Sequence, residues 1–223
     1  MLYAGGSSLL WLEGLSQRVG VSGTLTAIDL DAERIEETRD SLVEVGLAAP
    51  VRLLAGDVFE MPFDSGIFDL VYSSGLFHEL DVKEKSAQEA LDALRHVTRS
   101  GGRVATSDFV DSEPAVQLED EALEAELIRE ASGKVLYGIG PPERLVDLHE
   151  EVLADVRWLV SPPWKIRHLE KLVLAEDEPT ELGSLPPVAA RRFRERRVAL
   201  RARILREAYT RPSTIFVKGV VID

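Results

Sequence analysis

Short apolar runs rich in β-branched residues alternate with amphipathic helical patterns along the first half of the chain. Runs of four to seven residues are typical of strands, and the longer segments with an apolar stripe are typical of helices. This alternation predicts βαβ units and therefore a mostly parallel sheet covered by helices. The predicted strands are Met1–Tyr3, Thr24–Asp29, Val51–Ala55, Phe68–Ser73 and Arg103–Ser107, and the helices are Leu9 to near Gly20, Ala32–Val45 and Lys83–Thr98.

The pattern changes after Asp111, where longer helical stretches with strong charge bias replace the regular alternation. We expect one domain over residues 1–223, with a ligand-binding core at 1–111 and helical cap insertions at 112–140 and 162–210. A final strand is expected at the C-terminus. The elements predicted here are the acidic helix Glu113–Glu130, the helix Pro141–Glu151, the strand Val152–Val160, the arginine-rich helix Pro187–Tyr209 and the strand Thr214–Ile222.

Composition narrows the classes of function. The 223 residues suit one α/β domain, and the absence of cysteine excludes disulfides, thiolate metal sites and cysteine nucleophiles. A net charge of −13 argues against a nucleic-acid partner, since phosphate binding needs an excess of basic side chains. The sequence contains neither an apolar run of about 20 residues nor a secretory signal pattern, so we expect a cytoplasmic protein without a membrane partner.

Candidate binding residues follow the predicted strands, at the edge where a parallel sheet presents its ligand crevice. Gly5 and Gly6 after the first strand permit turns and close approach of a ligand. Asp29 ends the second strand, where a carboxylate can accept the ribose hydroxyls of a nucleoside. Asp57 ends the third and is suited to an exocyclic amine, while the segment 73–79 after the fourth borders the reacting group.

Three segments in this order carry a family resemblance: TAIDLDAERIEETRDSL, LAGDVFEMPFDSGIFDLVYSSGLFHEL and ALRHVTRSGGRVATSDF. Together they resemble class I S-adenosylmethionine-dependent methyltransferases, especially the small-molecule and quinone-type group. The resemblance covers about residues 2–111 and, more loosely, the terminal strand. It implies a three-layer Rossmann-like fold with a twisted, mostly parallel sheet whose C-terminal strand runs antiparallel. It also implies S-adenosylmethionine as cofactor and methyl transfer to a small molecule.

The resemblance also implies roles for the residues that would hold the adenosyl group. Asp29 would bind the ribose hydroxyls, and Leu30 would lie against the adenine ring. Asp57 would bind the adenine amine, and the backbone of Val58 would contact the same base.

Further roles concern the methionine end of the cofactor and the methyl acceptor. Gly5, followed by Gly6, would be the first glycine of the cofactor loop. Ser73 and Ser74 would lie near the methionine portion. His78 falls where many relatives carry a histidine beside the substrate, so it is the candidate general base.

The first loop departs from the family pattern D-x-G-x-G-x-G. Tyr3 stands at the acidic position, and Ser7 and Leu9 stand at the second and third glycine positions. Starting at Met1, the sequence has little room for the first strand or a preceding helix. Three explanations stay open: the sequence begins late, the true start lies upstream, or this member has lost part of its cofactor site.

Simpler interpretations of the site residues stay open as well. Asp29 could cap the following helix, although Asp31 fits that role better. Asp57 could be a turn residue, and His78 could be a packed histidine that moves no proton. The neighbourhood of His78 shows no second ligand cluster with metal-binding spacing, so no metal site is expected.

The basic segment Arg191–Arg206 also has two interpretations. Its arginines could contact an anionic ligand or nucleic acid. Alternatively, Phe193, Leu200 and Ile204 face inward while the arginines pair with carboxylates of Leu118–Glu130, which would pack the two insertions together as one cap.

Three functions compete on this evidence. The leading one is methyl transfer to a small-molecule acceptor. The second is a methyltransferase-like protein without transfer activity that serves as a ligand- or partner-binding module, motivated by the altered first loop. The third is a nicotinamide-dependent oxidoreductase, which ranks last because G-x-G-x-x-G is missing. Association into a homodimer is left open by the sequence.

Overall fold

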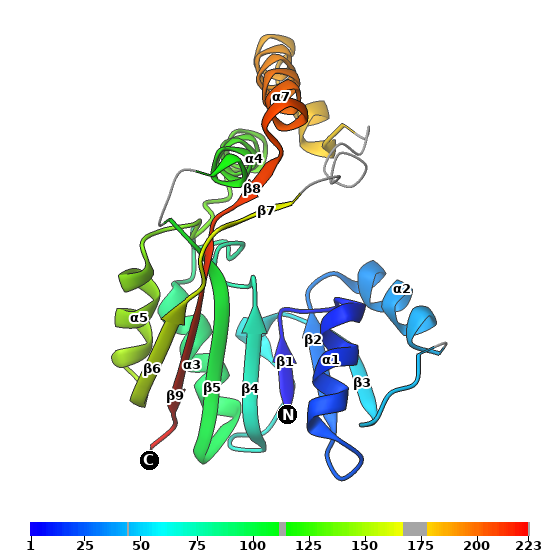
Figure 1. Ribbon diagram of the computed structural model, residues 1–223, viewed down its shortest axis with the longest axis vertical. Helices are drawn as coiled ribbons and strands as arrows, with labels where there is room; N and C mark the ends of the chain where they lie inside the picture. Colours follow the sequence, from blue (N-terminus) through cyan, green and yellow to red (C-terminus); the bar gives the residue numbers. More distant parts are fainter. Residues whose placement is uncertain (44, 112–114, 167–177, 223) are drawn as a thin grey trace.

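The computed structural model of this protein describes residues 1–43, 45–111, 115–166 and 178–222. Seven strands form one sheet (Figure 1). The first five strands along the chain run parallel to one another, whereas the C-terminal strand is antiparallel to the strand on either side of it. From edge to edge the strands are β3 (Val51–Ala55), β2 (Leu25–Asp29), β1 (Leu2–Ala4), β4 (Phe68–Ser74), β5 (Thr98–Val110), β9 (Ser213–Val220) and β6 (Ala154–Val160).

Helices cover both faces of this sheet, because successive side chains of each strand point to opposite faces. Tyr3 of β1 packs with the helices α1 (Leu9–Val19) and α2 (Ala32–Leu42), which lie over β1 to β3 in Figure 1. Its neighbour Leu2 belongs to the larger core on the other face, with α3 (Ala87–Val97) and α5 (Pro142–Glu150).

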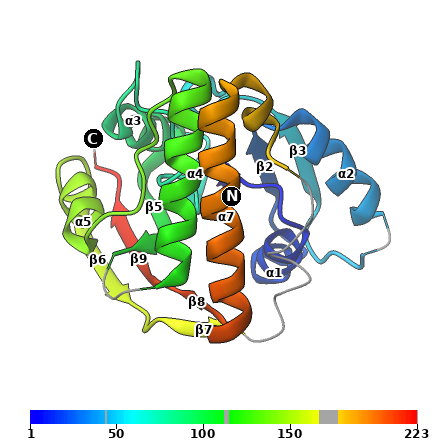
Figure 2. The same ribbon diagram turned by 90° about the horizontal axis from the view of Figure 1, so that it is seen from above.

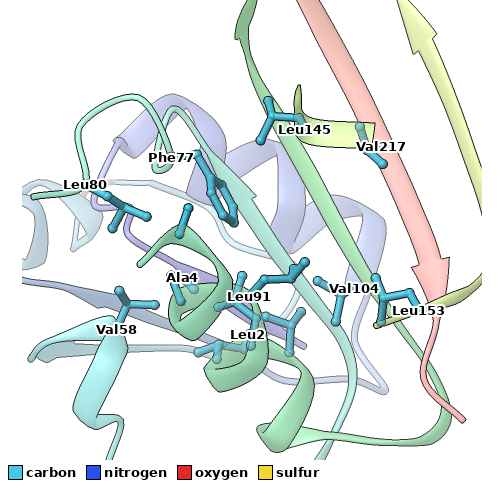
Figure 3. Close-up of a cluster of buried hydrophobic side chains, with 14 of the residues drawn as sticks. Leu2, Ala4, Val58, Phe77, Leu80, Leu91, Val104, Leu145, Leu153 and Val217 are labelled. Atoms are coloured by element: carbon cyan, nitrogen blue, oxygen red, sulfur yellow. The ribbon is translucent and has the colours of Figure 1, made fainter. Parts of the chain in front are cut away.

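Figure 3 shows the centre of this larger core, where Leu91 of α3 lies among Leu2, Ala4 and Val104. All four are completely shielded from solvent. Truncating a buried leucine such as Leu91 to alanine is expected to cost about 2–5 kcal/mol. The expected α/β fold, mostly parallel with an antiparallel C-terminal strand, is therefore confirmed.

A separate helical layer lies beyond the carboxyl ends of the parallel strands. It contains α4 (Val116–Ser132), the short helix η2 (Thr180–Ser184) and α7 (Pro187–Glu207). The strands β7 (Trp164–Ile166) and β8 (Tyr209–Arg211) form a two-stranded sheet that connects it to the main body (Figure 1). Seen from above, α4 and α7 lie side by side across the sheet (Figure 2). We call this layer the cap.

The cap has its own apolar core and a row of ion pairs. Phe193, Leu200 and Ile204 of α7 are buried against α4, as the sequence predicted. The arginines of α7 pair with carboxylates of α4, for example Arg196 with Glu126 at 2.7 Å. Of the two interpretations of the basic segment, the structure therefore supports packing of the two insertions together. Further pairs join Arg192 to Glu130 and Glu126, and Arg203 to Glu119.

The start of α3 differs from the prediction. The helix begins at Ala87, not at Lys83, because Ser86 and Glu89 form a capping box at its N-terminus. It ends at Val97, and the hydroxyl of Thr98 donates to Leu94 O at 2.7 Å, which satisfies one of the last helical carbonyls.

The strand after α3 is longer than predicted. β5 runs from Thr98 to Val110 rather than from Arg103 to Ser107, with Gly101 at φ +71° near its start. Gly102 meets the backbone so closely that a Cβ there would lie 2.7 Å from Arg99 O. The glycines Gly101 and Gly102 therefore shape the first residues of the strand.

Other element boundaries moved by a few residues, and four short elements were missed. α2 ends at Leu42 instead of Val45, and α7 ends at Glu207 instead of Tyr209. For the strand Val51–Ala55, both predicted bounds agree with the structure. The short elements without a sequence signal are β7, β8, η2 and the helix η1 (Val58–Glu60).

Candidate functional site

The two predicted ligand-binding carboxylates lie after neighbouring strands at one edge of the sheet. Asp29 is the last residue of β2 and pairs in register with Ala55, the last residue of β3. Gly56 N donates to Asp29 O at 2.8 Å, and Asp57 follows directly. Because the strands are parallel, both carboxylates belong to the edge where open α/β sheets bind ligands.

Each carboxylate uses one oxygen to hold its own loop. Asp29 Oδ1 accepts a hydrogen bond from Asp31 N at 3.0 Å, and Asp57 Oδ1 accepts one from Phe59 N at 2.9 Å. Among the described residues, neither Oδ2 atom accepts a hydrogen bond, although Lys85 Nζ lies 4.0 Å from that of Asp57. One oxygen of each carboxylate is thus available to a ligand hydroxyl or amine.

The side chain that caps α2 is Asp31, which accepts from Arg34 N at 3.0 Å. The helix-cap interpretation of Asp29 therefore does not hold. Next to Asp29, Leu30 exposes 74% of its surface, and Val58 beside Asp57 is buried. Both follow a carboxylate at the edge where the resemblance places the adenine ring.

The two glycines of the first loop make room for side chains of the chain itself. Gly5 N and Gly6 N both donate to Ile28 O, at 2.8 and 3.1 Å. A Cβ at Gly5, where φ is +66°, would lie 2.5 Å from Leu76 Cδ1, and one at Gly6 would lie 2.1 Å from Tyr3 Cζ. The loop is held between β2, the segment after β4 and the ring of Tyr3.

Tyr3 occupies the position where the family pattern has an acidic residue. It is 2% exposed, and its ring stacks on Tyr72 with 5.8 Å between centroids. Burial raises the pKa of the Tyr3 phenol, and the charges of Tyr72, Asp29 and Glu79 raise it further. A neutral phenol therefore replaces a carboxylate here, and Asp29 and Glu79 both act on it from the same crevice.

The two predicted serines at the end of β4 are tied to β5. Ser73 is completely buried, and its hydroxyl donates to Thr106 Oγ1 at 3.4 Å. Ser74 Oγ accepts from Ser107 Oγ at 3.0 Å, and Ser107 Oγ also shares a hydrogen bond of 2.7 Å with Tyr72 OH. A ligand could therefore meet Ser73 only through its backbone.

His78 forms a close pair with a carboxylate that sequence reasoning did not single out. His78 Nδ1 lies 2.6 Å from Asp108 Oδ1, and both side chains are buried, at 7% and 1% exposed. The ring of His78 also packs against Phe109 at 5.3 Å between centroids. A cavity of about 10 Å³ borders the pair. It has about the volume of one water probe.

The charged partners of His78 raise its pKa by more than burial lowers it. Burial alone would lower its pKa, but the hydrogen bond to Asp108 and the charges of Asp108, Glu79 and Glu121 raise the pKa to about 8. Such a histidine exchanges its proton near neutral pH, and the neutral ring that a general base needs becomes the major form above about pH 8.

Carboxylates of the core and the cap face each other above this pair. The Glu79 side chain is 75% exposed, yet the protein surrounds it closely enough for burial to raise its pKa, with Glu121 adding to the effect. Burial likewise raises the pKa of Glu124 on α4, helped by Glu121, Asp120 and Glu79. We call the space that Glu79, Glu121 and Glu124 border, between the cap and the strand ends, the acidic recess.

The remaining histidines have other surroundings. His149 is completely buried, and burial lowers its pKa to about 4. His96 is exposed at the end of α3, and His168 lies outside the described residues. Among the part of the chain that the structure describes, no group of three or more histidine and acidic side chains could hold a metal ion. No helix in the same part is long and apolar enough to cross a bilayer.

A hollow of larger volume lies away from the carboxyl ends of the strands. It measures about 790 Å³ and is lined by residues such as Met61, Gly66, His96 and Val221. None of the predicted site residues borders it, and it lies beside the end of α3. Ligands of open α/β sheets bind at the carboxyl ends of the strands, so we assign no role in the site to this hollow.

The comparison with known families concerns the first half of the chain. Residues 3–106 match the family described as "Methyltransferase domain". A ubiquinone/menaquinone biosynthesis C-methyltransferase UbiE from Stutzerimonas stutzeri is 30% identical over 122 residues, which cover 55% of this chain and 45% of that protein. The enzyme of the same name from Idiomarina loihiensis is 31% identical over 106 residues, covering 48% and 40%. The matched segment spans less than half the length of these relatives.

Solved structures resemble the whole chain in fold. The YcgJ protein from Bacillus subtilis superimposes with a TM-score of 0.61 at 15% identity, covering 100% of this chain and 91% of its own. Geranyl diphosphate C-methyltransferase from Streptomyces coelicolor A3(2), in complex with Mg²⁺, geranyl diphosphate and S-adenosyl-L-homocysteine, gives 0.54 at 12% identity, covering 99% and 70%.

Proposed function

Residues 3–106 of this chain belong to the class I S-adenosylmethionine-dependent methyltransferase family, and from that premise we propose that the protein transfers a methyl group from S-adenosylmethionine to a small-molecule acceptor. The observation that carries the proposal is the pair of carboxylates Asp29 and Asp57 at the tips of adjacent parallel strands, each with one oxygen that no described residue hydrogen-bonds.

The residues at this edge fit an adenosyl group. Asp29 would accept hydrogen bonds from both ribose hydroxyls, and Asp57 would accept one from the adenine amine. The exposed Leu30 and the backbone of Val58 would flank the base. Gly5–Gly6, with Ser73 and Ser74, would border the methionine portion.

When bound, the cofactor supplies a methyl group activated by a sulfonium sulfur. The chain's own contribution is alignment of the acceptor and removal of its proton where the nucleophile carries one. His78 is placed for that step, because its Nε2 faces the recess while Asp108 holds Nδ1. The proton that leaves the acceptor would reside on Nε2 and pass to solvent after transfer.

The cap would complete the cleft. We assign the cofactor-binding core to residues 1–111 and the acceptor contacts to the insertions at 112–140 and 162–210, within one domain of 223 residues. Its position beyond the strand ends supports exclusion of water from the reacting atoms (Figure 1).

Calorimetric titration tests cofactor binding. We expect micromolar affinity for S-adenosylmethionine and none for NAD. Asp29→Ala should weaken S-adenosylmethionine binding by about 1–3 kcal/mol through loss of a charged acceptor. Asp40→Ala, which removes the same charge from the exposed end of α2, is the matched control. Equal affinity of the two variants would place the cofactor elsewhere.

Methyl transfer is tested by release of S-adenosylhomocysteine with a panel of acceptors. The relatives' names suggest including a demethylated quinol and geranyl diphosphate, beside simple phenols and amines. Turnover with any acceptor supports the proposal.

The altered first loop supports a second candidate. Tyr3 stands at the position where the family pattern has a carboxylate, and its ring fills the space beside Gly6. A chain that binds S-adenosylmethionine but methylates no acceptor in the panel would be a ligand- or partner-binding module instead.

The remaining expectations concern partners and location. A net charge of −13 supports a small-molecule acceptor over a nucleic acid. A homodimer and a cytoplasmic location are proposals from the sequence, which light scattering of the purified chain and fractionation of cells would test.

A further inference from the structure

Asp108 lies near the end of β5 and is 2% exposed. Its carboxylate accepts backbone hydrogen bonds from Phe77 N at 2.8 Å, His78 N at 3.2 Å and Phe109 N at 2.7 Å. Its fourth contact is His78 Nδ1 at 2.6 Å. One side chain thus fixes both the backbone and the ring of the segment that follows β4.

The surroundings of Asp108 make the histidine its charge partner. A buried carboxylate is costly unless hydrogen bonds and an opposite charge compensate it. Among the described residues, the only basic side chain within ion-pair distance of Asp108 is His78. An apolar residue of the same volume would leave these three backbone N–H groups and the His78 ring without their acceptor.

The pair also defines which ring nitrogen exchanges a proton. A carboxylate can only accept, so Nδ1 must be the protonated nitrogen of neutral His78. Nε2 then faces the recess, where Glu79 Oε1 lies 3.7 Å away. The ring is held on one side by Phe109, which packs on it, and at Nδ1 by Asp108.

We propose that Asp108 is a positioning residue: it holds His78 in a single orientation and tautomer, with Nε2 directed at the acceptor's proton. The inference rests on the proposed methyl transfer and names the group that prepares its base. In the step itself, the acceptor's O–H or N–H bond breaks and its proton moves to Nε2. The acceptor's electron pair forms the bond to the methyl carbon as the carbon–sulfur bond of the donor breaks, and the sulfur would leave with that bond's electrons as a neutral thioether. Asp108 then offsets the charge of the imidazolium.

The charged groups around His78 come from three elements. Asp108 belongs to β5, Glu79 to the segment after β4, and Glu121 to α4 of the cap, and each of them favours the protonated ring. Only Asp108 contacts Nδ1, so only its removal should change both the proton affinity and the tautomer.

Histidine nitrogen NMR on the protein without ligand tests the pairing directly. In the wild type we expect His78 to titrate near pH 8 and, once neutral, to carry its proton on Nδ1. His149, whose pKa is lowered to about 4, provides an internal reference that stays neutral throughout. A neutral His78 with its proton on Nε2 would overturn the proposal without any variant.

Two substitutions separate positioning from general charge. In Asp108→Asn the His78 pKa should fall below 6.5, because burial then acts without the carboxylate, and the single tautomer should be lost. Asp111→Asn, which removes a charge from an exposed residue just after β5, should leave both unchanged. A folded Asp108→Asn protein with unaltered His78 signals would refute the proposal. If Asp108→Asn does not fold, the wild-type tautomer decides.

Kinetics connect the pair to the reaction. With an acceptor from the panel, Asp108→Asn should lower kcat by about 10²-fold or more, as expected for impaired proton transfer, while the Kd for S-adenosylmethionine is unchanged. An unchanged kcat over the pH range would contradict the positioning role. Absence of turnover in the wild type would refute the proposed function instead, while the NMR result would stand separately.

Discussion

Two buried histidines of this protein contact successive residues on the same face of β5, and their proton affinities move in opposite directions. His149 Nε2 lies 2.9 Å from the hydroxyl of Thr106, and burial lowers its pKa to about 4. His78 Nδ1 lies 2.6 Å from the carboxylate of Asp108, and its pKa rises to about 8. Both rings are largely shielded from solvent, so the charge of the partner, not burial, decides which histidine can work as a base.

The two histidines also differ in their position in the fold. His149 Nδ1 lies 2.7 Å from Leu145 O within α5, and the ring lies among core side chains such as Phe77. It is a packed, neutral group. His78 follows the end of β4 beside the recess beneath the cap, where a ligand at the strand ends would arrive. The second histidine therefore has both the proton affinity and the location that catalysis needs.

The largest expected effect is on acid stability through His149. Its folded pKa lies below the unfolded value of about 6.5, so its contribution is complete above that pH and is lost as the pH falls toward 4. Wild-type protein should lose about 3 kcal/mol more than His149→Gln between pH 7 and pH 4, measured by urea unfolding. His96→Gln, on the exposed end of α3, is the control. Parallel curves for wild type and His149→Gln would mean that His149 is not buried as a neutral ring.

The second effect has the opposite sign and belongs to His78. Its folded pKa lies above the unfolded value, so its contribution is present below pH 6.5 and is lost as the pH rises through 8. Between pH 6 and pH 9 the wild type should lose about 2 kcal/mol more than His78→Gln. Urea unfolding at both pH values measures this difference, and a wild type that becomes more stable over this range relative to His78→Gln would contradict the assignment.

A smaller effect is expected from the carboxylate on the recess side of His78. Glu79→Gln should lower the His78 pKa by about 0.5 unit, because a partly solvated charge near 4 Å acts weakly. His149 should not respond. NMR titration of both histidines in one sample gives the comparison, and an equal shift in both would indicate a general structural change.

The smallest effect tests the place of the cap. Glu121→Gln on α4 should lower the His78 pKa by less than Glu79→Gln does, and Glu119→Gln on the outer, arginine-paired side of α4 should not change it. The same titration detects this. If the cap does not lie over the pair of His78 and Asp108, Glu121→Gln will leave the His78 pKa unchanged at every salt concentration.

The sheet and the adenosyl end of the site could be predicted because their signals are local. Val51–Ala55 is a continuous strand run, and Asp29 and Asp57 are found by their distance from strand ends. The start of α3 was misjudged because the capping pair of Ser86 and Glu89 competes with helix-forming residues before it. Periodicity alone does not resolve that competition.

The pair of His78 and Asp108 could not be predicted from local sequence in the same way. Asp108 and His78 are 30 residues apart in sequence and meet only because β4 and β5 are adjacent. The register of that pairing, with Ser74 beside Ser107, is the signal that could have identified Asp108. The sequence also could not predict that the Tyr3 ring fills the space beside Gly6, since this depends on which face of β1 carries the Tyr3 side chain.

A crystal structure of the protein with S-adenosylhomocysteine tests the central claim most directly. The account predicts the ribose hydroxyls within hydrogen-bond distance of Asp29 and the adenine amine at Asp57, with the sulfur on the side of His78. An adenosyl group bound away from the carboxyl ends of β2 and β3, or no binding at millimolar concentration, would contradict it.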